Sequence, residues 1–174
     1  LFKELAETDD MTHLLNKRSF MPLFQHAAEQ AISSSQPLTA MMIDADNLKD
    51  INDQFGHPAG DKLILTVATA IADCLRATDI VCRYGGDEFV AVLPKVSPEK
   101  ALELGERLRK AVANTSFDVG GRRIAATVSI GMATYPSQVP DITQLLEKAD
   151  ESLYISKRTG RNRVMQYGEE IVST

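Results

Sequence analysis

The chain has 174 residues, of which 44% are hydrophobic and 25% charged, values that are ordinary for one soluble globular domain with a full core. Its formal net charge of -5 argues against a broad nucleic-acid surface, because such surfaces need clustered Lys and Arg. No apolar run approaches the roughly 18 residues that a membrane-spanning helix needs. No signal peptide is recognisable.

Hydrophobic periodicity and turn residues predict the elements in chain order. They are a helix over about 17–33 capped by Asn16, a strand over 38–44, a short helix over 48–55 ended by Gly56, a helix from Pro58 to about residue 76, strands over 80–84 and 89–93, a helix from Ser97 or Pro98 to about 113, a hairpin of 117–119 and 123–134, a helix over 142–157 and a strand over 163–167. This mixture indicates an α+β fold, in which helices flank a central, mostly antiparallel sheet.

The two ends of the chain carry expectations about its context. The first residue is Leu1 rather than Met, so we expect a piece of a longer protein with any sensor or membrane anchor upstream. Residues 1–7 are predicted to be the end of an upstream helix or a linker. Residues 8–168 would form the functional domain, and residues 169–174 a tail.

The turn Gly85-Gly86-Asp87-Glu88 is the sharpest local feature of the sequence. It joins the strands over 80–84 and 89–93, whose apolar character on both faces predicts a central hairpin. Glycines let a backbone approach a ligand closely. Adjacent acids on an extended chain point in opposite directions, so both serve one metal only if the turn geometry allows it. Taken alone, the turn is equally consistent with a solvated acidic hairpin.

A second acidic pair ends the strand over 38–44. Asp44 and Asp46 are spaced by two residues and should share one face of the strand end. Asp44 together with a turn acid would suit Mg²⁺, which takes few protein carboxylates and completes its shell with substrate phosphates. Two such ions can activate an attacking oxygen and stabilise a leaving one. The alternative is an Asx turn that simply ends the strand.

Asn52 and Asp61 flank a glycine-containing turn that could read a base. A carboxylate with an amide nearby can pair with the edge of guanine, although Asp61 alone could be a first-turn helix acid. His57 has no Cys or His partner at metal-ligand spacing. The sequence contains no Ser-His-Asp, HExxH, CxxC or Walker-type pattern.

In their order and spacing, these motifs resemble the GGDEF family of diguanylate cyclases. The similarity comprises the opening stretch Asp10–Arg18, the segments 43–53 and 55–61, the unmodified signature 83–89, the tripeptide 129–131 and the segment 149–162. It covers about residues 8–165. Leu48 replaces the family's usual Phe, Ser156 its Ala and His13 its Gly, and none of these departures removes a charge or a ligand.

The resemblance implies a ferredoxin-like GGDEF fold, related to the palm of nucleotidyl cyclases, that condenses two GTP into cyclic di-GMP and releases two pyrophosphates. It implies Mg²⁺, with Mn²⁺ as an alternative, and two ions per active site. The metal ligands would be Asp44, Asp87, Glu88 and the Ala45 carbonyl, with Asp87 and Glu88 catalytic. The substrate contacts that it implies are the phosphate-facing Gly85, Gly86, Asn47, Leu48 and Lys49, the guanine-reading Asn52 and Asp61, and the triphosphate-binding Lys157 and Arg161.

A further resemblance concerns regulation. Arg76 and Asp79 form an R-x-x-D that ends six residues before Gly85, the spacing of the product-binding inhibitory site in the family. Arginine suits phosphate and guanine recognition through its planar fork. Arg107 would be a secondary arginine of this site, or equally a solvated helix arginine.

The family also implies partners. Two domains would meet in an antiparallel homodimer, driven by an upstream sensor, in the cytoplasm; this domain would contact no nucleic-acid polymer and no membrane. The rival hypotheses are a catalytically silent effector that binds GTP or cyclic di-GMP, a cyclase for other purines, and a structural dimerisation module. The acids with Lys157 and Arg161 weigh against the first, and Asn52 with Asp61 weighs against the second.

Overall fold

A computed structural model describes residues 6–169. Its elements are β1 (Leu15–Asn16), α1 (Lys17–Ser34), β2 (Leu38–Ala45), α2 (Leu48–Phe55), α3 (His57–Cys74), β3 (Ile80–Arg83), β4 (Glu88–Pro94), α4 (Pro98–Ala113), β5 (Ser116–Val119), β6 (Arg122–Ala125), β7 (Val128–Tyr135), the 3₁₀ turn η1 (Ile142–Gln144), α5 (Leu145–Arg158) and β8 (Val164–Gln166). Within residues 6–169 no helix is both long and apolar enough to cross a bilayer.

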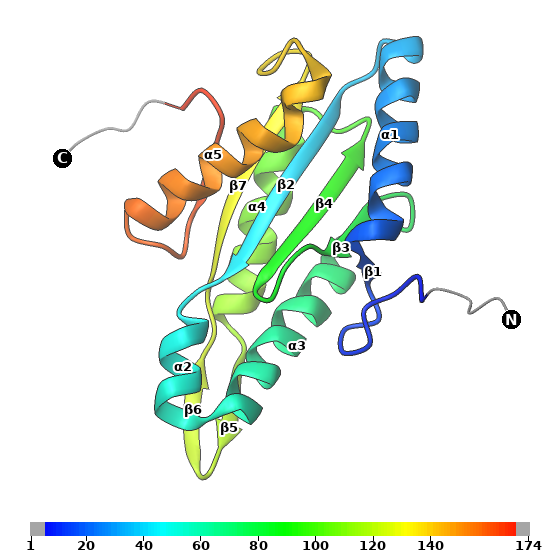
Figure 1. The fold of residues 1–174 in the computed structure, drawn as a ribbon. Coiled ribbons are helices and arrows are strands. Elements are labelled where there is room, and N and C mark those ends of the chain that lie inside the picture. The colour runs from blue at the N-terminus through cyan, green and yellow to red at the C-terminus, as the bar shows by residue number, and fades with distance from the viewer. Residues whose placement is uncertain (1–5, 170–174) are drawn as a thin grey trace, which may run out of the picture.

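The main sheet has six strands in the order β1-β3-β4-β2-β7-β8. The inner pairs β3–β4, β4–β2 and β2–β7 are antiparallel, and the outer pairs β1–β3 and β7–β8 are parallel. Strands β5 and β6 form a separate antiparallel hairpin, which lies with α2 at one end of the molecule (Figure 1). The predicted α+β architecture with a mostly antiparallel central sheet is confirmed.

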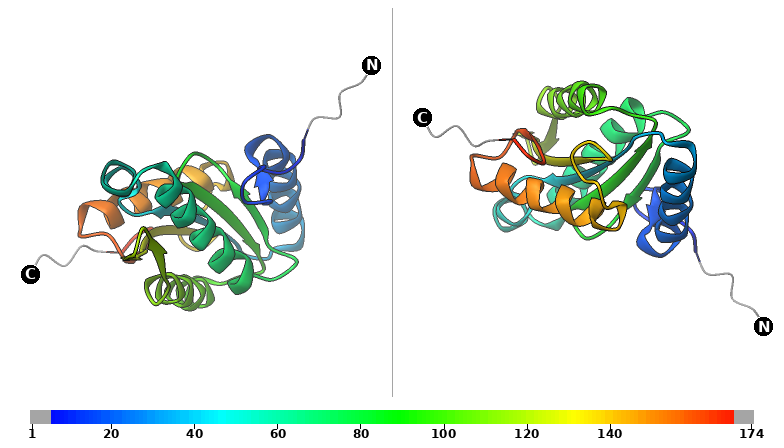
Figure 2. Two further views of the ribbon diagram at one scale, coloured as in Figure 1. Left: turned by 90° about the horizontal axis from the view of Figure 1, so that it is seen from below. Right: turned by 90° about the horizontal axis from the view of Figure 1, so that it is seen from above.

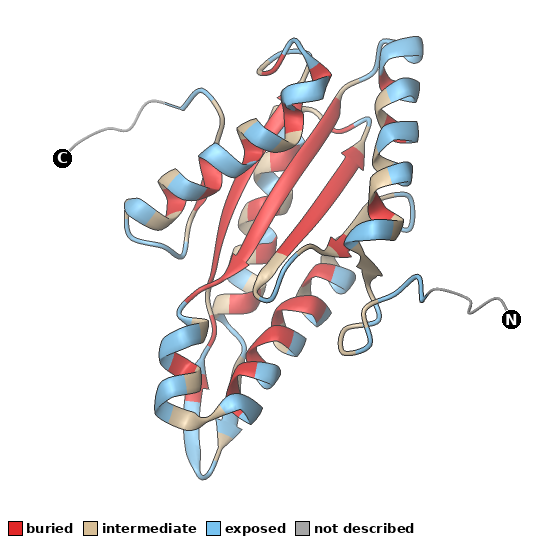
Figure 3. Cartoon of the chain, viewed as in Figure 1, coloured by how far each residue is buried: buried red, intermediate tan, exposed pale blue. Residues whose placement is uncertain are grey.

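Helices cover both faces of this sheet (Figure 2). Alternate residues of β2 point to opposite faces, as a strand requires. Met41 and Ile43 belong to the hydrophobic cluster that α3 and α4 cover, whereas Ala40 and Met42 belong to the cluster covered by α1 and α5. Because both faces are covered, every residue of β2 is buried (Figure 3).

The helices begin and end close to where the sequence predicts. Asn16 caps α1 by accepting a hydrogen bond from the Ser19 backbone N–H at 2.9 Å. The bounds of α2 agree with the prediction, and Gly56 ends that helix with φ +88°. The predicted helix over 142–157 is confirmed, but its first turn is the 3₁₀ turn η1.

Three predictions about strands and ends need correction. The expected strand over 123–134 is two strands, because β6 leaves the main sheet to pair with β5 and β7 begins only at Val128. The hairpin of β3 and β4 is only half central: β4 is interior, whereas β3 is flanked by the two-residue β1, which the sequence did not predict. Of the helix expected over 1–7, residues 1–5 lie outside the described part, and residues 6 and 7 are not helical.

The opening motif is centred on Asp9 rather than Asp10. Asp9 accepts hydrogen bonds from the backbone N–H and hydroxyl of Thr12, both at 2.8 Å, and pairs with Arg83 at 3.3 Å. Asp10 is exposed. The motif therefore begins one residue earlier than predicted, since only Asp9 is placed to join the N-terminal segment to β3.

Candidate active site

The site is built on the end of β2. Asp44 lies opposite Glu88 of β4 and Ser129 of β7, so its position is set by ladders on both sides. Its carboxylate is 4% exposed and forms an ion pair through Oδ2 with Lys157, which lies in the last turn of α5. The other oxygen, Oδ1, is buried and has no hydrogen-bond partner among the described residues. Asp44 thus presents one free oxygen toward the site.

Burial dominates the electrostatics of these acids. Desolvation raises the pKa of Asp44 to about 7 against the lowering effect of Lys157, and the nearby Asp87 carboxylate raises it further. The pKa of Glu88 is also raised, mainly by burial, with Lys157 opposing and Asp150 and Asp87 adding to the shift. A cation that neutralised this cluster would therefore be favoured.

The turn between β3 and β4 is held against the end of β2. The Ala45 backbone N–H donates to the Asp87 carbonyl at 3.0 Å, and the Tyr84 N–H donates to the Glu88 carbonyl at 2.8 Å. The Arg83 guanidinium donates to the Gly86 carbonyl at 2.8 Å. A Cβ added at Gly86 would meet nothing within 4 Å, so the turn has open space beside Gly86.

The donor set fits a hard divalent cation completed by substrate. Asp44 supplies a buried oxygen that has no hydrogen-bond partner among the described residues, and the Asp87 carboxylate is close enough for its charge to raise the Asp44 pKa. No group of three or more His, Cys, Asp or Glu side chains placed to hold a metal occurs within residues 6–169. Mg²⁺ does not require one, since it commonly binds one or two carboxylates together with phosphates and water.

Helix α2 starts directly beyond the end of β2. Asn47 precedes it with φ +63°, and its side chain caps no N–H. The backbone N–H groups of Leu48 and Lys49 open the first turn, where N–H groups have no partner within a helix and attract anions. The structure thus brings the predicted phosphate contacts to the same end of the sheet as Asp44.

Asn52 and Asp61 lie on adjoining helices, α2 and α3. The Oδ1 atom of Asn52 is buried and has no hydrogen-bond partner among the described residues, whereas Asp61 is exposed in the first turns of α3. Gly60 leaves the space that Asn52 occupies, because a Cβ at Gly60 would stand 1.9 Å from that Oδ1 atom. The Asn52 side chain therefore packs against the first turn of α3, the helix that also carries Asp61.

The loop after α5 carries Arg161. Arg161 is exposed, has φ +61°, and donates its backbone N–H to the Ser156 carbonyl at 3.0 Å. Asp46, which should share a face with Asp44, is buried but engaged elsewhere, with Ser129, Thr127 and the Asn162 N–H. The two acids at the end of β2 therefore have separate surroundings.

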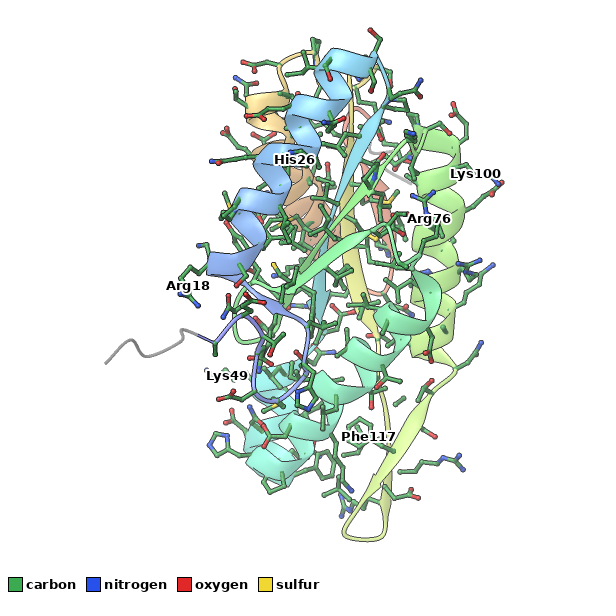
Figure 4. The ribbon with its side chains drawn as sticks, turned by 90° about the vertical axis from the view of Figure 1, so that its right-hand side faces the viewer. Arg18, His26, Lys49, Arg76, Lys100 and Phe117 are labelled. Carbon is green, nitrogen blue, oxygen red and sulfur yellow. The ribbon has the colours of Figure 1, made fainter. Side chains whose placement is uncertain are left out.

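The predicted inhibitory residues are brought together away from α2. Arg76 pairs with Asp79 at 2.8 Å and donates to the Pro94 carbonyl at 3.0 Å. Arg76 and Arg107 line one surface cavity of about 570 Å³, together with Lys95 and Lys100. Figure 4 shows Arg76 and Lys100 beside α4, well apart from Lys49. Arg107 also donates to the Cys74 carbonyl at 2.6 Å, so it joins α4 to the end of α3.

The sequence analysis named Asp46 only as the neighbour of Asp44 on the strand end, and it gave no separate role to Gly60 or Arg83. Asp46 and Gly60 lie inside motifs that the sequence identified, but their roles depend on contacts with distant segments. Arg83 lies just before the signature turn and donates hydrogen bonds to Asp9 and to the Gly86 carbonyl. Its position next to the turn was the one feature of the sequence that could have indicated a supporting role.

The raised pKa of Asp44 predicts a pH dependence of stability. Between about pH 4 and 7 the folded protein keeps a proton here that the unfolded chain has released, so this group lowers stability as the pH rises through that window. Asp44→Asn cannot titrate. In the absence of metal and nucleotide, its free energy of unfolding relative to the unmodified protein should therefore increase from pH 4.5 to 8, by up to a few kcal/mol at about 1.4 kcal/mol per pKa unit.

Urea unfolding at several pH values measures this difference. Lys157→Met is the matched variant, because losing the ammonium should move the titration of Asp44 to higher pH, as ¹³C shifts of its carboxyl would report. Parallel stability curves for Asp44→Asn and the unmodified protein would contradict the raised pKa.

Comparisons with known proteins agree on one family. The family model described as "Diguanylate cyclase, GGDEF domain" matches residues 6–163. Diguanylate cyclase DosC of Escherichia coli (strain K12) is 41% identical over 169 residues, which cover 94% of this chain and 36% of that protein. Response regulator PleD of Caulobacter vibrioides (strain NA1000 / CB15N) is 38% identical over 164 residues, covering 93% and 36%. The chain thus spans little more than a third of the length of these relatives.

Solved structures show the same relationship. The GGDEF domain of DgcB from Caulobacter crescentus in complex with c-di-GMP matches with a TM-score of 0.90 and 30% identity, covering 97% of both chains. The active GGEEF domain of a diguanylate cyclase from Vibrio cholerae matches with a TM-score of 0.82 and 32% identity, covering 90% of this chain and 99% of that one. From its sequence, its fold and the arrangement of its acidic turn, this chain belongs to the GGDEF-domain family of diguanylate cyclases.

Proposed function

We propose that this domain is a working diguanylate cyclase, which joins two GTP into cyclic di-GMP and releases two pyrophosphates. The observation that carries the proposal is the pairing of Asp44, with its buried unpartnered oxygen, and Asp87 at the end of the sheet. A divalent cation bound there would neutralise the acids and the triphosphate and polarise the reacting phosphate. Mg²⁺ or Mn²⁺, two ions per site, suits these oxygen donors.

The protein's own groups would mainly bind and orient the substrate. The phosphates would be held by the N–H groups of Leu48 and Lys49 at the start of α2 and by Lys157 and Arg161 near the end of α5. Gly85 and Gly86 leave the space for them. Glu88 has a raised pKa and is the nearest candidate to accept the proton of the attacking 3′-hydroxyl.

Guanine would be read between α2 and α3. The unpaired Oδ1 of Asn52 and the exposed carboxylate of Asp61 are acceptors that guanine's N1–H and N2–H groups can satisfy. Adenine presents an acceptor at N1, which a carboxylate would repel.

One domain holds one such site, whereas the product needs two GTP. We therefore propose an antiparallel homodimer, in which the 3′-hydroxyl on each domain attacks the α-phosphate on the other. The N-terminal segment joins the site through Asp9, Arg83 and the Gly86 carbonyl, which offers a route for input from an upstream sensor. The structure of the coiled coil and GGDEF domain of DgcB, with a TM-score of 0.85 and 30% identity, shows a helical segment joined to such a domain.

We also propose that cyclic di-GMP inhibits the enzyme through Arg76, Asp79 and Arg107. The cavity that they adjoin carries the additional cations Lys95 and Lys100, which suits a ligand with two phosphates. The Asp79 side chain is fully buried and pairs with Arg76, whose side chain is 51% exposed. The guanidinium of Arg76 is thus held through its Nε and Nη2 atoms, while about half of the side chain stays exposed to a ligand.

Purified protein with GTP and Mg²⁺ should yield cyclic di-GMP and pyrophosphate in a ratio of one to two, identified by mass. Asp87→Ala and Asp44→Ala should abolish this product while circular dichroism shows a folded protein, because each removes a carboxylate that the metal requires. Asp53→Ala, an exposed acid on α2, is the control. A protein that binds GTP without turnover would be the silent effector instead, and full activity in either variant would refute the metal assignment.

Asp61→Ala should reduce the preference for GTP over ATP, because the carboxylate that accepts guanine's donors and repels adenine is gone. The loss should be on the order of tenfold in the ratio of kcat/KM values, as for one charged hydrogen bond. Asp73→Ala, at the far end of α3, is the matched control. An unchanged ratio would mean that guanine is recognised elsewhere.

Arg76→Ala should weaken inhibition by cyclic di-GMP about tenfold or more, while KM for GTP stays the same, because one charged contact to the product is lost. Progress curves with added cyclic di-GMP measure the inhibition constant. If the constants of the variant and the unmodified protein agree, Arg76 and Asp79 form only a local ion pair, worth about 0.2–1 kcal/mol to stability.

A further inference from the structure

Asp46 is a buried carboxylate to which the proposed reaction gives no part. It lies just beyond β2 and is 4% exposed. Its Oδ1 accepts from the Ser129 hydroxyl at 2.6 Å, and its Oδ2 accepts from the Thr127 hydroxyl at 2.8 Å and from the Asn162 backbone N–H at 3.1 Å. The last bond is the only one of the three that leaves the β7 side and reaches the loop after α5.

That loop has an unusual backbone. Gly160, Arg161 and Asn162 have φ of +129°, +61° and +45°, in the region that L side chains seldom adopt. Such a run persists when surrounding contacts determine it. The Ser156 carbonyl holds the Arg161 N–H at 3.0 Å, and Asp46 holds the N–H of the next residue. Asn162 is also fixed through its side-chain oxygen, which accepts from Arg109 at 3.1 Å.

We propose that Asp46 is a positioning residue that fixes Arg161 relative to Asp44. It thereby raises the affinity of the site for the nucleotide's triphosphate. Asp44 and Asp46 belong to one strand end, so this arrangement ties the metal-facing carboxylate and the arginine loop to the same rigid backbone. The inference rests on the proposed contact of Arg161 with the triphosphate.

The sign of the effect on binding distinguishes a positioning role from a purely electrostatic one. A carboxylate near a polyphosphate repels it, so if Asp46 acted only through its charge, its removal would tighten binding of the nucleotide. A positioning role predicts the opposite sign. Asparagine would preserve the geometry: its oxygen can accept from Thr127 and Asn162, while its amide donates to the Ser129 hydroxyl, which can also accept.

The test uses 3′-deoxy-GTP, which lacks the attacking hydroxyl, and calorimetry with Mg²⁺. Asp46→Ala should weaken its binding roughly tenfold, the size of one misplaced charged contact, and leave GMP binding unchanged. Asp46→Asn should stay within about threefold. Asp141→Ala, which removes an aspartate that caps the exposed turn η1, is the control. If Asp46→Ala does not fold, Asp46→Ser serves instead, since its hydroxyl is too short to reach the Asn162 N–H.

Arg161→Ala and the double variant separate the possible failures. If Asp46 acts through Arg161, the double variant should bind no more weakly than Arg161→Ala alone. Unchanged binding by Arg161→Ala would refute the proposed triphosphate contact itself. Weakened binding by Arg161→Ala with normal or tighter binding by Asp46→Ala would overturn only the positioning role. The positioning role would also be overturned if Asp46→Ala lost GMP affinity to the same extent, or if the double variant bound more weakly than Arg161→Ala.

Discussion

Two buried carboxylates at the end of β2, Asp44 and Asp46, have to be compensated, because a charge removed from water costs several kcal/mol unless it is paired and hydrogen-bonded. The structure compensates them differently. Asp46 receives donors on both oxygens, from β7 and from the loop after α5. Within residues 6–169, Asp44 receives one ammonium on one oxygen and no donor on the other. The hydrogen bonds of Asp46 are completed by the fold, whereas the compensation of the Asp44 charge is left incomplete.

The incomplete compensation of Asp44 is the reason for placing the proposed metal site at this end of the sheet. Burial beside Asp87 raises the pKa of Asp44, and the opposing Lys157 does not cancel the shift. The Lys157 pKa is itself raised, since its pairing with Asp44 outweighs its burial. Lys157 therefore supplies at Asp44 the positive charge that a metal would supply in the proposed complex. A cation bound at Asp44 would leave the ammonium available for the negative phosphates.

The sequence predicts elements whose patterns are local. The capping of α1 by Asn16, the end of α2 at Gly56 and the hairpin of β3 and β4 follow from residues close along the chain. Strand β1 could not be predicted, because two residues carry no periodicity and it exists only by pairing with β3. The break before Val128 likewise depends on Thr127, whose hydroxyl binds Asp46 and whose carbonyl accepts the Asp46 N–H at 3.0 Å.

In the candidate site, too, only the features set by local sequence could be predicted. Asp44, Asp87 and Glu88 could be predicted as site residues from a strand end and a turn, and the structure brings them to one place. The supporting role of Gly60 could not be predicted, since Gly60 matters only because Asn52 of the preceding helix fills the space beside it. The register of the opening motif could not be predicted either, because Asp9 and Asp10 are adjacent and only their contacts in the fold, with Thr12 and Arg83, distinguish them.

The proposed function depends on Asp44 and Asp87 binding a divalent metal together with GTP. A crystal structure with Mn²⁺ and 3′-deoxy-GTP would test this, because the anomalous signal locates the ion. We expect Mn²⁺ bound by oxygens of Asp44, Asp87 and the phosphates, Lys157 moved from Asp44 to the triphosphate, and guanine against Asn52 and Asp61. Nucleotide bound elsewhere, or bound while Lys157 remains on Asp44 with no ion between the carboxylates, would contradict it.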